Sequence, residues 1–173
     1  MAADTERGFR EFEHSGDVGI EAWGATRAEL IEHATRGLFA LLVWRAPSDN
    51  AAGPVVVPPR GFARGDPGPP PPAAVSNDES RLQRTIEVHT TSAADVLVDW
   101  LSEVVTAAAT YGEVYDDVAI ESADENSARG TIRGQPFDPA RHERRFDVKA
   151  ATYYNLVCEK TPDGFHARVV FDL

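Results

Sequence analysis

The stretch VGIEAWGATRAELIEHATRGLFALL, residues 18–42, predicts a strand followed directly by a capped helix. Apolar residues alternate with other residues over 18–23, as they do in a half-buried strand. Thr26 then stands three residues before Glu29, which is the spacing of a capping box at a helix N-terminus. Beyond this box the apolar residues recur at helical spacing and give the helix one apolar face, formed by Leu30, Ile31, Ala34, Leu38, Leu41 and Leu42.

The same pattern recurs 66 residues further along the chain. Residues 85–89 alternate as a strand, and Ser92 stands where a second helix would begin. That helix has an apolar face of its own, and the offset of 66 relates Thr26 to Ser92 and Leu30 to Val96 without a gap. The match predicts a duplicated unit of secondary structure. Chance similarity between two amphipathic helices is the alternative.

Beyond the second helix the pattern is that of strands, at 118–121, 128–133, 146–150, 154–159 and 165–171. The segment 134–139 is expected to break the chain, and the turn at 161–164 predicts a hairpin between the last two strands. Two helices with one apolar face each and six or more half-polar strands predict an α+β fold. We expect a two-layer sandwich, with a largely antiparallel sheet and two helices on one face.

A proline-rich segment interrupts this plan. Nine of the twelve prolines lie between Pro47 and Pro72, interleaved with glycines. Proline removes backbone donors and glycine costs conformational entropy, so this segment cannot form a helix or a central strand. The sequence therefore predicts one domain over 1–173 with a mostly disordered insertion at about 45–80.

The bulk composition limits the choice of partners. The net charge of −11 argues against broad binding to nucleic-acid phosphates and against docking on anionic membranes. A basic partner or metal ions would suit this charge, although it could also serve solubility alone. The N-terminus has no signal-peptide hydrophobic region and no apolar run is long enough to span a membrane, so we expect a cytoplasmic protein. Cys158 stands alone in an apolar run, which is typical of a buried structural thiol.

Two acidic segments at opposite ends of the sequence are the main candidate site. The C-terminal strand ends on Asp172, beside the backbone and terminal oxygens of Leu173, and Asp17 follows His14 in a turn rich in small residues. If the fold joins these segments, the result is an oxygen-rich pocket suited to a hard divalent cation. A solvated strand end and an ordinary turn are the alternative interpretation.

Signatures of catalysis are absent from the sequence. It contains no Rossmann, P-loop, zinc-finger or HExxH motif and no Gly-x-Ser-x-Gly elbow, and its five histidines are scattered. A basic segment at 139–145 stands out in an acidic protein. It could bind an anion or an acidic partner, and the alternative is a solvated loop and strand face.

Together these segments resemble the archease family. The resemblance covers nearly the whole chain outside the predicted insertion, in the family's order. It is carried by EHSGDVGI at 13–20, AWG at 22–24, DVLVDWL at 95–101, GQPFDPARHE at 134–143, VKAATY at 148–153 and VFDL at 170–173. The chain departs from the family's usual pattern at Ser15 and Gly16, and at Leu173, where isoleucine is common.

The resemblance implies a non-enzymatic activator. Archeases assist the GTP-dependent RNA ligase that joins 3′-phosphate or 2′,3′-cyclic-phosphate ends to 5′-hydroxyl ends in tRNA splicing and RNA repair. They are thought to promote guanylylation of a histidine in the ligase active site and so to permit multiple turnover. GTP would be met only through the ligase, and no stable contact with nucleic acid is expected. The family also looks built from duplicated strand–helix–strand–strand units.

The resemblance also implies a metal site at Asp17, Asp172 and Leu173, with Leu173 contributing a backbone or terminal oxygen and calcium as the expected ion. Lys149 and His14 are the residues expected to contact the partner or a phosphate. Without the resemblance, two alternatives stay open. One is a metal-dependent hydrolase that uses Asp17 and His14, and the other is a calcium-binding, chaperone-like interaction module.

Overall fold

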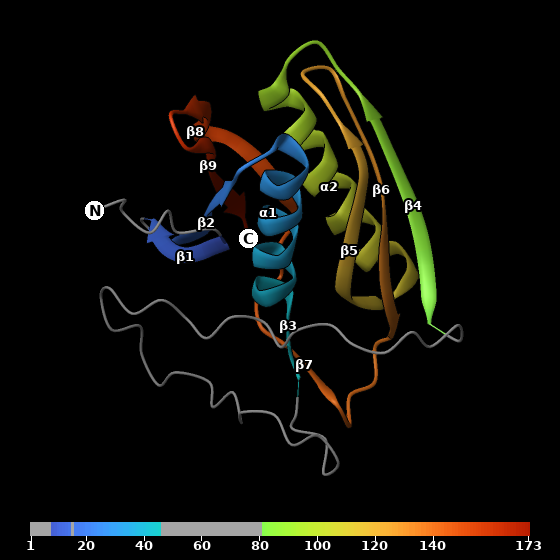
Figure 1. Ribbon diagram of the computed structural model, residues 1–173. Helices are drawn as coiled ribbons and strands as arrows, with labels where there is room; N and C mark the ends of the chain where they lie inside the picture. The colour runs from blue at the N-terminus through green and yellow to red at the C-terminus, as the bar shows by residue number, and fades with distance from the viewer. Residues whose placement is uncertain (1–7, 15, 46–80) are drawn as a thin grey trace, which may run out of the picture.

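The structure, a computed structural model, describes residues 8–14, 16–45 and 81–173 (Figure 1). Within these residues the chain forms two helices and nine strands. In chain order they are β1 (Gly8–His14), β2 (Asp17–Gly24), α1 (Arg27–Leu42), β3 (Val43–Arg45), β4 (Leu82–His89), α2 (Ala93–Tyr111), β5 (Glu113–Ala123), β6 (Ser127–Pro136), β7 (His142–Arg144), β8 (Ala150–Thr161) and β9 (Gly164–Asp172).

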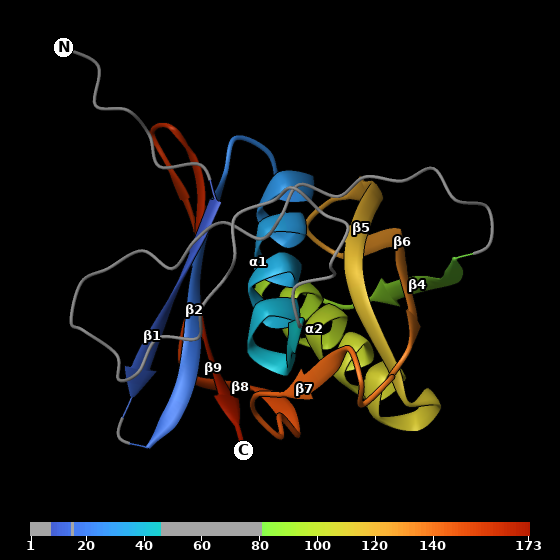
Figure 2. The same ribbon diagram turned by 90° about the horizontal axis from the view of Figure 1, so that it is seen from below.

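The strands form two main antiparallel sheets, which lie on either side of the helix pair (Figure 2). One sheet has the order β1-β2-β9-β8 and the other has the order β4-β6-β5, while β3 and β7 form a separate two-stranded ladder. Helix α1 packs on β2 and β5, and α2 packs on β8 and β4, so each helix contacts both sheets. The predicted α+β fold with two helices and antiparallel strands is confirmed. The expected two-layer arrangement, with both helices on one face of a single sheet, is wrong, because β4, β6 and β5 form a second sheet on the other side of the helices.

Both main sheets are built from the same strand–helix–strand–strand unit. The second unit is continuous in the chain as β4-α2-β5-β6, and its strands lie in the order β4-β6-β5. The first unit is β2-α1-β8-β9, and its order β2-β9-β8 is equivalent. The second unit is therefore inserted between α1 and β8 of the first. The predicted duplication is present in the topology, and the offset of 66 residues relates β2 to β4 as well as α1 to α2.

Both helices begin at the predicted capping residues. The Oγ1 atom of Thr26 accepts a hydrogen bond from the N–H of Glu29 at 3.1 Å, and the Glu29 carboxylate accepts one from the N–H of Ala25 at 2.7 Å. The Oγ atom of Ser92 accepts from the N–H of Asp95 at 3.2 Å. These bonds satisfy N–H groups that have no partner within the first helical turn.

Trp100 lies in the core at the contact between the two helices. Its fully buried indole donates from Nε1 to the Oγ1 atom of Thr35 at 2.9 Å, and the Thr35 hydroxyl donates to the carbonyl of Ile31 at 2.6 Å. Leaving a buried N–H unpaired would cost about 1–3 kcal/mol. The Thr35 hydroxyl on α1 therefore helps to fix the position of Trp100 and so of α2.

The strand predicted at 146–150 is wrong over residues 146–149. These four residues form no strand, and β8 begins at Ala150. The N–H of Phe146 donates to the carbonyl of Leu41 at 3.2 Å, in the last turn of α1. The last carbonyls of a helix have no partners within the helix, so this segment satisfies α1 instead of extending a sheet.

Two further predicted boundaries can be compared with the structure. The break predicted at 134–139 is wrong over 134–136, where β6 continues to Pro136. Glycine at 134 permits this close pairing with β5, since a Cβ there would lie 1.9 Å from the carbonyl oxygen of Val114. Of the predicted insertion at 45–80, Arg45 ends β3 and the remainder lies outside the described residues.

Among the described helices, none has both the length and the apolar character that crossing a membrane requires.

Candidate functional site

The fold brings the two acidic segments to the same end of one sheet. Strands β2 and β9 are antiparallel neighbours, and Val18 pairs with Phe171. This is the last pair of the ladder, and continuing its register by one residue sets Asp17, at the start of β2, opposite Asp172, at the end of β9. Directly opposite residues on neighbouring strands share a face, with Cβ atoms about 4.5–5.5 Å apart. Figure 2 shows the start of β2 and the end of β9 at this same end of the sheet.

The other predicted site residues lie beside this pair. His14 pairs with Asp17 in the backbone register, although its side chain lies outside what the structure describes. Lys149 precedes β8, and its backbone N–H donates to the carbonyl of Asp172 at 2.9 Å. Its Nζ atom donates to the backbone oxygen of Leu173, also at 2.9 Å. We call the group Asp17, Asp172, Leu173 and Lys149 the acidic tip.

The two aspartates of the acidic tip have no direct charge partner among the described residues. Asp17 is half-buried and Asp172 is exposed, and within the described part of the chain neither side chain makes a hydrogen bond or an ion pair. Like charges directly opposite one another destabilise a sheet. A cation held between them would remove this repulsion.

The donor set of the acidic tip suits a hard cation. It consists of two carboxylates and the Leu173 backbone oxygen, and Ca²⁺ and Mg²⁺ take oxygen ligands. The described residues contain no cluster of three or more histidine, cysteine, aspartate or glutamate side chains placed to hold a metal. The backbone oxygen would therefore be the third protein ligand, and the remaining coordination positions would be open.

The duplicated unit lacks an equivalent of the acidic tip. The offset of 66 residues places Gln83 where the first unit has Asp17, and Gln83 pairs with Arg133 on β6. Arg133 in turn donates to the carboxylate of Asp117 at 3.0 Å. A neutral amide and a paired arginine thus occupy the positions that hold Asp17 and Asp172 in the first unit. The candidate site is specific to one end of the molecule.

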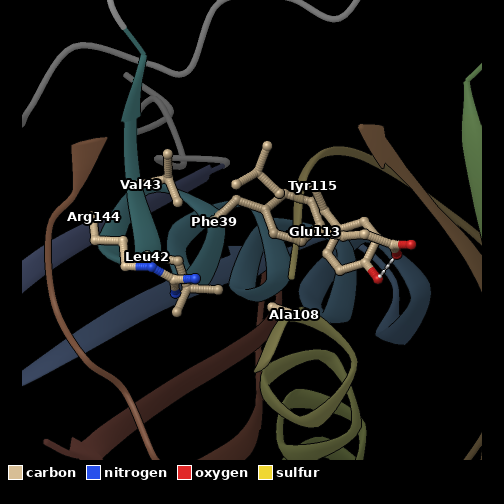
Figure 3. Close-up of a pocket in the computed structure, with 8 residues that line it drawn as sticks. Phe39, Leu42, Val43, Ala108, Glu113, Tyr115 and Arg144 are labelled. Carbon is tan, nitrogen blue, oxygen red and sulfur yellow. Dashed lines mark hydrogen bonds between the residues drawn. The ribbon is translucent and has the colours of Figure 1, made fainter. Parts of the chain in front are cut away.

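A small cavity between α1, α2 and β5 is a second feature with charged residues in its lining (Figure 3). The Glu113 carboxylate accepts from Tyr115 Oη at 2.6 Å and from Arg84 at 2.6 and 2.7 Å. These hydrogen bonds lower the pKa of Glu113, and the bond from Arg84 has the largest effect. Burial is the main cause of the raised pKa of Tyr115. The cavity has room for about one water (≈ 20 Å³), so these groups are structural.

The basic segment at 139–145 is also tied into the fold. His142 is buried and accepts the N–H of Asp138 at 2.9 Å, and burial lowers its pKa. Arg145 is 7% exposed in its side chain and bonds both carboxylate oxygens of Glu11, at 2.8 and 2.6 Å. Two of the candidate anion-binding residues therefore have intramolecular roles.

The thiol of Cys158 is half-buried and lies 3.7 Å from the carbonyl of Ala93. Burial raises the pKa of Cys158, which favours the thiol over the nucleophilic thiolate. This agrees with the structural role expected from the sequence.

Known proteins resemble this chain both in its fold and over the residues of the acidic tip. The chain matches the sequence profile of the archease protein family (MTH1598/TM1083) over residues 9–52 and 72–173. The chain belongs to the archease family. Its matched parts include Asp17, Lys149, Asp172 and Leu173, so the whole acidic tip lies within the region that the family shares.

Individual archeases match along nearly their full length. The chain is 28% identical to the protein archease of Pyrococcus furiosus over 171 residues, covering 96% of this chain and 99% of the relative. It is 26% identical to the protein archease of Methanopyrus kandleri, covering 95% and 99%.

Two solved structures resemble this archease in fold. The solution structure of Methanobacterium thermoautotrophicum protein 1598 has a TM-score of 0.62 and 25% identity, with 96% of this chain and 99% of that one covered. The crystal structure of an "archease, possible chaperone" from Thermotoga maritima has a TM-score of 0.54 and 16% identity, with 94% of each chain covered.

Sequence reasoning did not find the contact of Lys149 with the end of β9. The sequence shows a lysine in a motif, but the strand register that places it at Leu173 depends on the pairing of β8 with β9. The sequence predicts that β8 and β9 form a hairpin around the 161–164 turn. Counting residues back from this turn does not give the partner of Lys149, because the register of β8 and β9 shifts between Thr152 and Val157.

Proposed function

We propose that this archease is a non-enzymatic activator of the GTP-dependent RNA ligase that joins 3′-phosphate or 2′,3′-cyclic-phosphate RNA ends to 5′-hydroxyl ends. In this role it serves tRNA splicing and RNA repair by promoting guanylylation and multiple turnover of the ligase. The observation that supports the proposal is the pairing of β2 with β9, which brings Asp17 and Asp172 to the end of the sheet where Lys149 contacts the Leu173 oxygen. Within the described residues, neither carboxylate forms an ion pair.

Asp17, Asp172 and the Leu173 oxygen would hold a divalent cation, for which we propose calcium. A hard cation with few protein ligands keeps coordination positions for phosphate or carboxylate oxygens of a partner. Because the acidic tip ends two neighbouring strands, it can enter a concave surface of the ligase without rearrangement of the sheet. In this proposal GTP binds only to the ligase, and this chain supplies no catalytic group of its own.

The direct test measures ligation of a 3′-phosphate RNA by a purified GTP-dependent ligase present in large deficit over the RNA. We expect the chain to raise the number of turnovers per ligase and the fraction of guanylylated ligase, with calcium present. The chain alone should release no phosphate and cleave no RNA. Metal-dependent turnover by the chain alone would favour the hydrolase alternative, and unchanged ligation would contradict the proposal.

A second experiment examines Lys149. Its ammonium group contacts the same Leu173 oxygen that would bind the cation, so the two positive charges compete. In a water-like environment their repulsion at about 4 Å amounts to on the order of 1 kcal/mol, or about fivefold in Kd. We therefore expect Lys149→Met to bind calcium about fivefold more tightly in calorimetric titration.

The matched control for this experiment is Lys160→Met, at the far end of β8. This variant should leave the calcium affinity unchanged. Weaker binding by Lys149→Met would mean that the lysine supports the ligand geometry, and the competition described above would be wrong.

A further inference from the structure

A bulge in β8 displays two adjacent tyrosines to solvent. Thr152 pairs with Val170, but the next pair joins Val157 to Arg168, so four residues of β8 stand opposite one residue of β9. Side chains of successive strand residues normally point to opposite faces. Here Tyr153 and Tyr154 are instead both exposed, at 58% and 59%.

The bulge depends on an unusual backbone conformation. Asn155 has φ 49°, in the left-handed region that residues other than glycine rarely adopt, and asparagine is among the most tolerant of it. Bulges of this kind commonly re-aim side chains at sites of function. Exposed tyrosines are also typical anchors of protein interfaces.

Tyr153 lies against a helix face that carries only negative charge. Helix α2 packs on β8, and it carries Asp95, Asp99 and Glu103 at helical spacing and no lysine or arginine. The hydroxyl of Tyr153 donates to the Asp95 carboxylate at 2.9 Å, so the two groups form one surface. Asp95 raises the pKa of Tyr153, with a smaller contribution from Asp99.

Two of these carboxylates have no structural explanation. Asp95 caps the helix through Ser92 and suits the positive end of its dipole. Asp99 and Glu103 are exposed, and within the residues that the structure describes they form no ion pair. Carboxylates four residues apart on a helix repel each other. Within the described residues no cation offsets this repulsion, and Asp99 acts on Tyr153 directly.

We infer that Tyr153, Tyr154, Asp95, Asp99 and Glu103 form a docking surface for an arginine- or lysine-bearing segment of a partner protein. Guanidinium and ammonium groups can pair with Asp99 and Glu103 while they stack on the tyrosine rings. The same negative charge disfavours RNA and anionic membranes as occupants. The surface uses none of the residues of the acidic tip, and the inference does not depend on the proposed function.

The test uses the isotope-labelled full chain and a short oligo-arginine peptide at physiological salt, where long-range attraction is screened. We expect amide shift changes at Tyr153, Tyr154 and the first three turns of α2. The variant Asp99→Asn/Glu103→Gln should bind the peptide about tenfold more weakly, and Tyr153→Ser/Tyr154→Ser should also weaken it severalfold.

The control variant Glu143→Gln/Asp163→Asn removes the same charge from exposed positions on β7 and in the β8–β9 turn. It should bind the peptide as the unmodified chain does. Equal weakening in both charge variants would show attraction to the net charge alone and would overturn the inference. Shift changes confined to the acidic tip, or tighter binding of a single-stranded RNA than of the peptide, would overturn it as well.

Discussion

Asp17→Asn and Asp172→Asn are each expected to weaken calcium binding by at least about tenfold and to abolish the stimulation of the RNA ligase. Each substitution removes one of the two charged ligands and keeps the size and shape of the side chain. The Leu173 oxygen and one carboxylate then remain, which leaves too few charged donors for a hard cation. Calorimetric titration with calcium measures the first effect, and multiple-turnover ligation measures the second.

The stability of these variants should change in opposite directions with and without calcium. Two like charges about 5 Å apart at a surface repel by up to about 1 kcal/mol. In a chelator, Asp172→Asn should therefore unfold at the same or slightly higher urea concentration than the unmodified chain. With saturating calcium the order should reverse, because only the unmodified chain gains binding free energy in its folded state.

Asp163→Asn is the matched control, since Asp163 is exposed and lies at the opposite end of β9. This variant should change neither calcium affinity nor ligation. If Asp17→Asn and Asp172→Asn stimulate the ligase fully while remaining folded, the acidic tip is not the activating site. If calcium stabilises all variants equally, the ion binds elsewhere.

The sequence was sufficient for the parts of this fold that depend on local pattern. Thr26 and Ser92 were predicted as helix starts because a capping side chain acts within one turn, and both accept the expected hydrogen bonds. The duplication was visible because equivalent core positions, such as Leu38 and Val104, are both fully buried and must both stay apolar. The turn at 161–164 follows from its proline and glycine.

Features that depend on distant contacts were not predictable in this way. The segment 146–149 alternates apolar and charged residues as a strand does, yet the N–H of Phe146 bonds the end of α1, which lies about a hundred residues earlier in the chain. The division of the strands into two sheets depends on insertion of one unit into the other, which local periodicity does not report. The proximity of Asp17 and Asp172 was predicted because their carboxylates suit a hard cation, but the sequence does not show the pairing of β2 with β9 that brings the two residues to the same end of the sheet.

Arg145 is the residue whose loss is expected to destabilise the fold most through electrostatics. Its guanidinium bonds both oxygens of Glu11 on β1 and donates to the carbonyl of Ala40 at 3.0 Å near the end of α1. It thus joins the edge strand of one sheet, a helix end and the segment that leads to Lys149. Arg145→Met should lower the free energy of unfolding by about 3–5 kcal/mol, because Glu11 is left as a largely buried charge.

Comparison with Arg10 separates this effect from that of an ordinary ion pair. Arg10 pairs with Glu21 but is 54% exposed, and the buried Glu21 keeps a second arginine, Arg168, at 3.7 Å, so Arg10→Met leaves no unpaired buried charge and should cost less than about 1 kcal/mol. The double variant Arg145→Met/Glu11→Met should recover part of the lost stability, since replacing both partners removes the unpaired charge. Urea unfolding of the four proteins measures this. A double variant less stable than Arg145→Met alone would show that Glu11 contributes by some other contact, and the segment before Lys149 would then owe its position to packing.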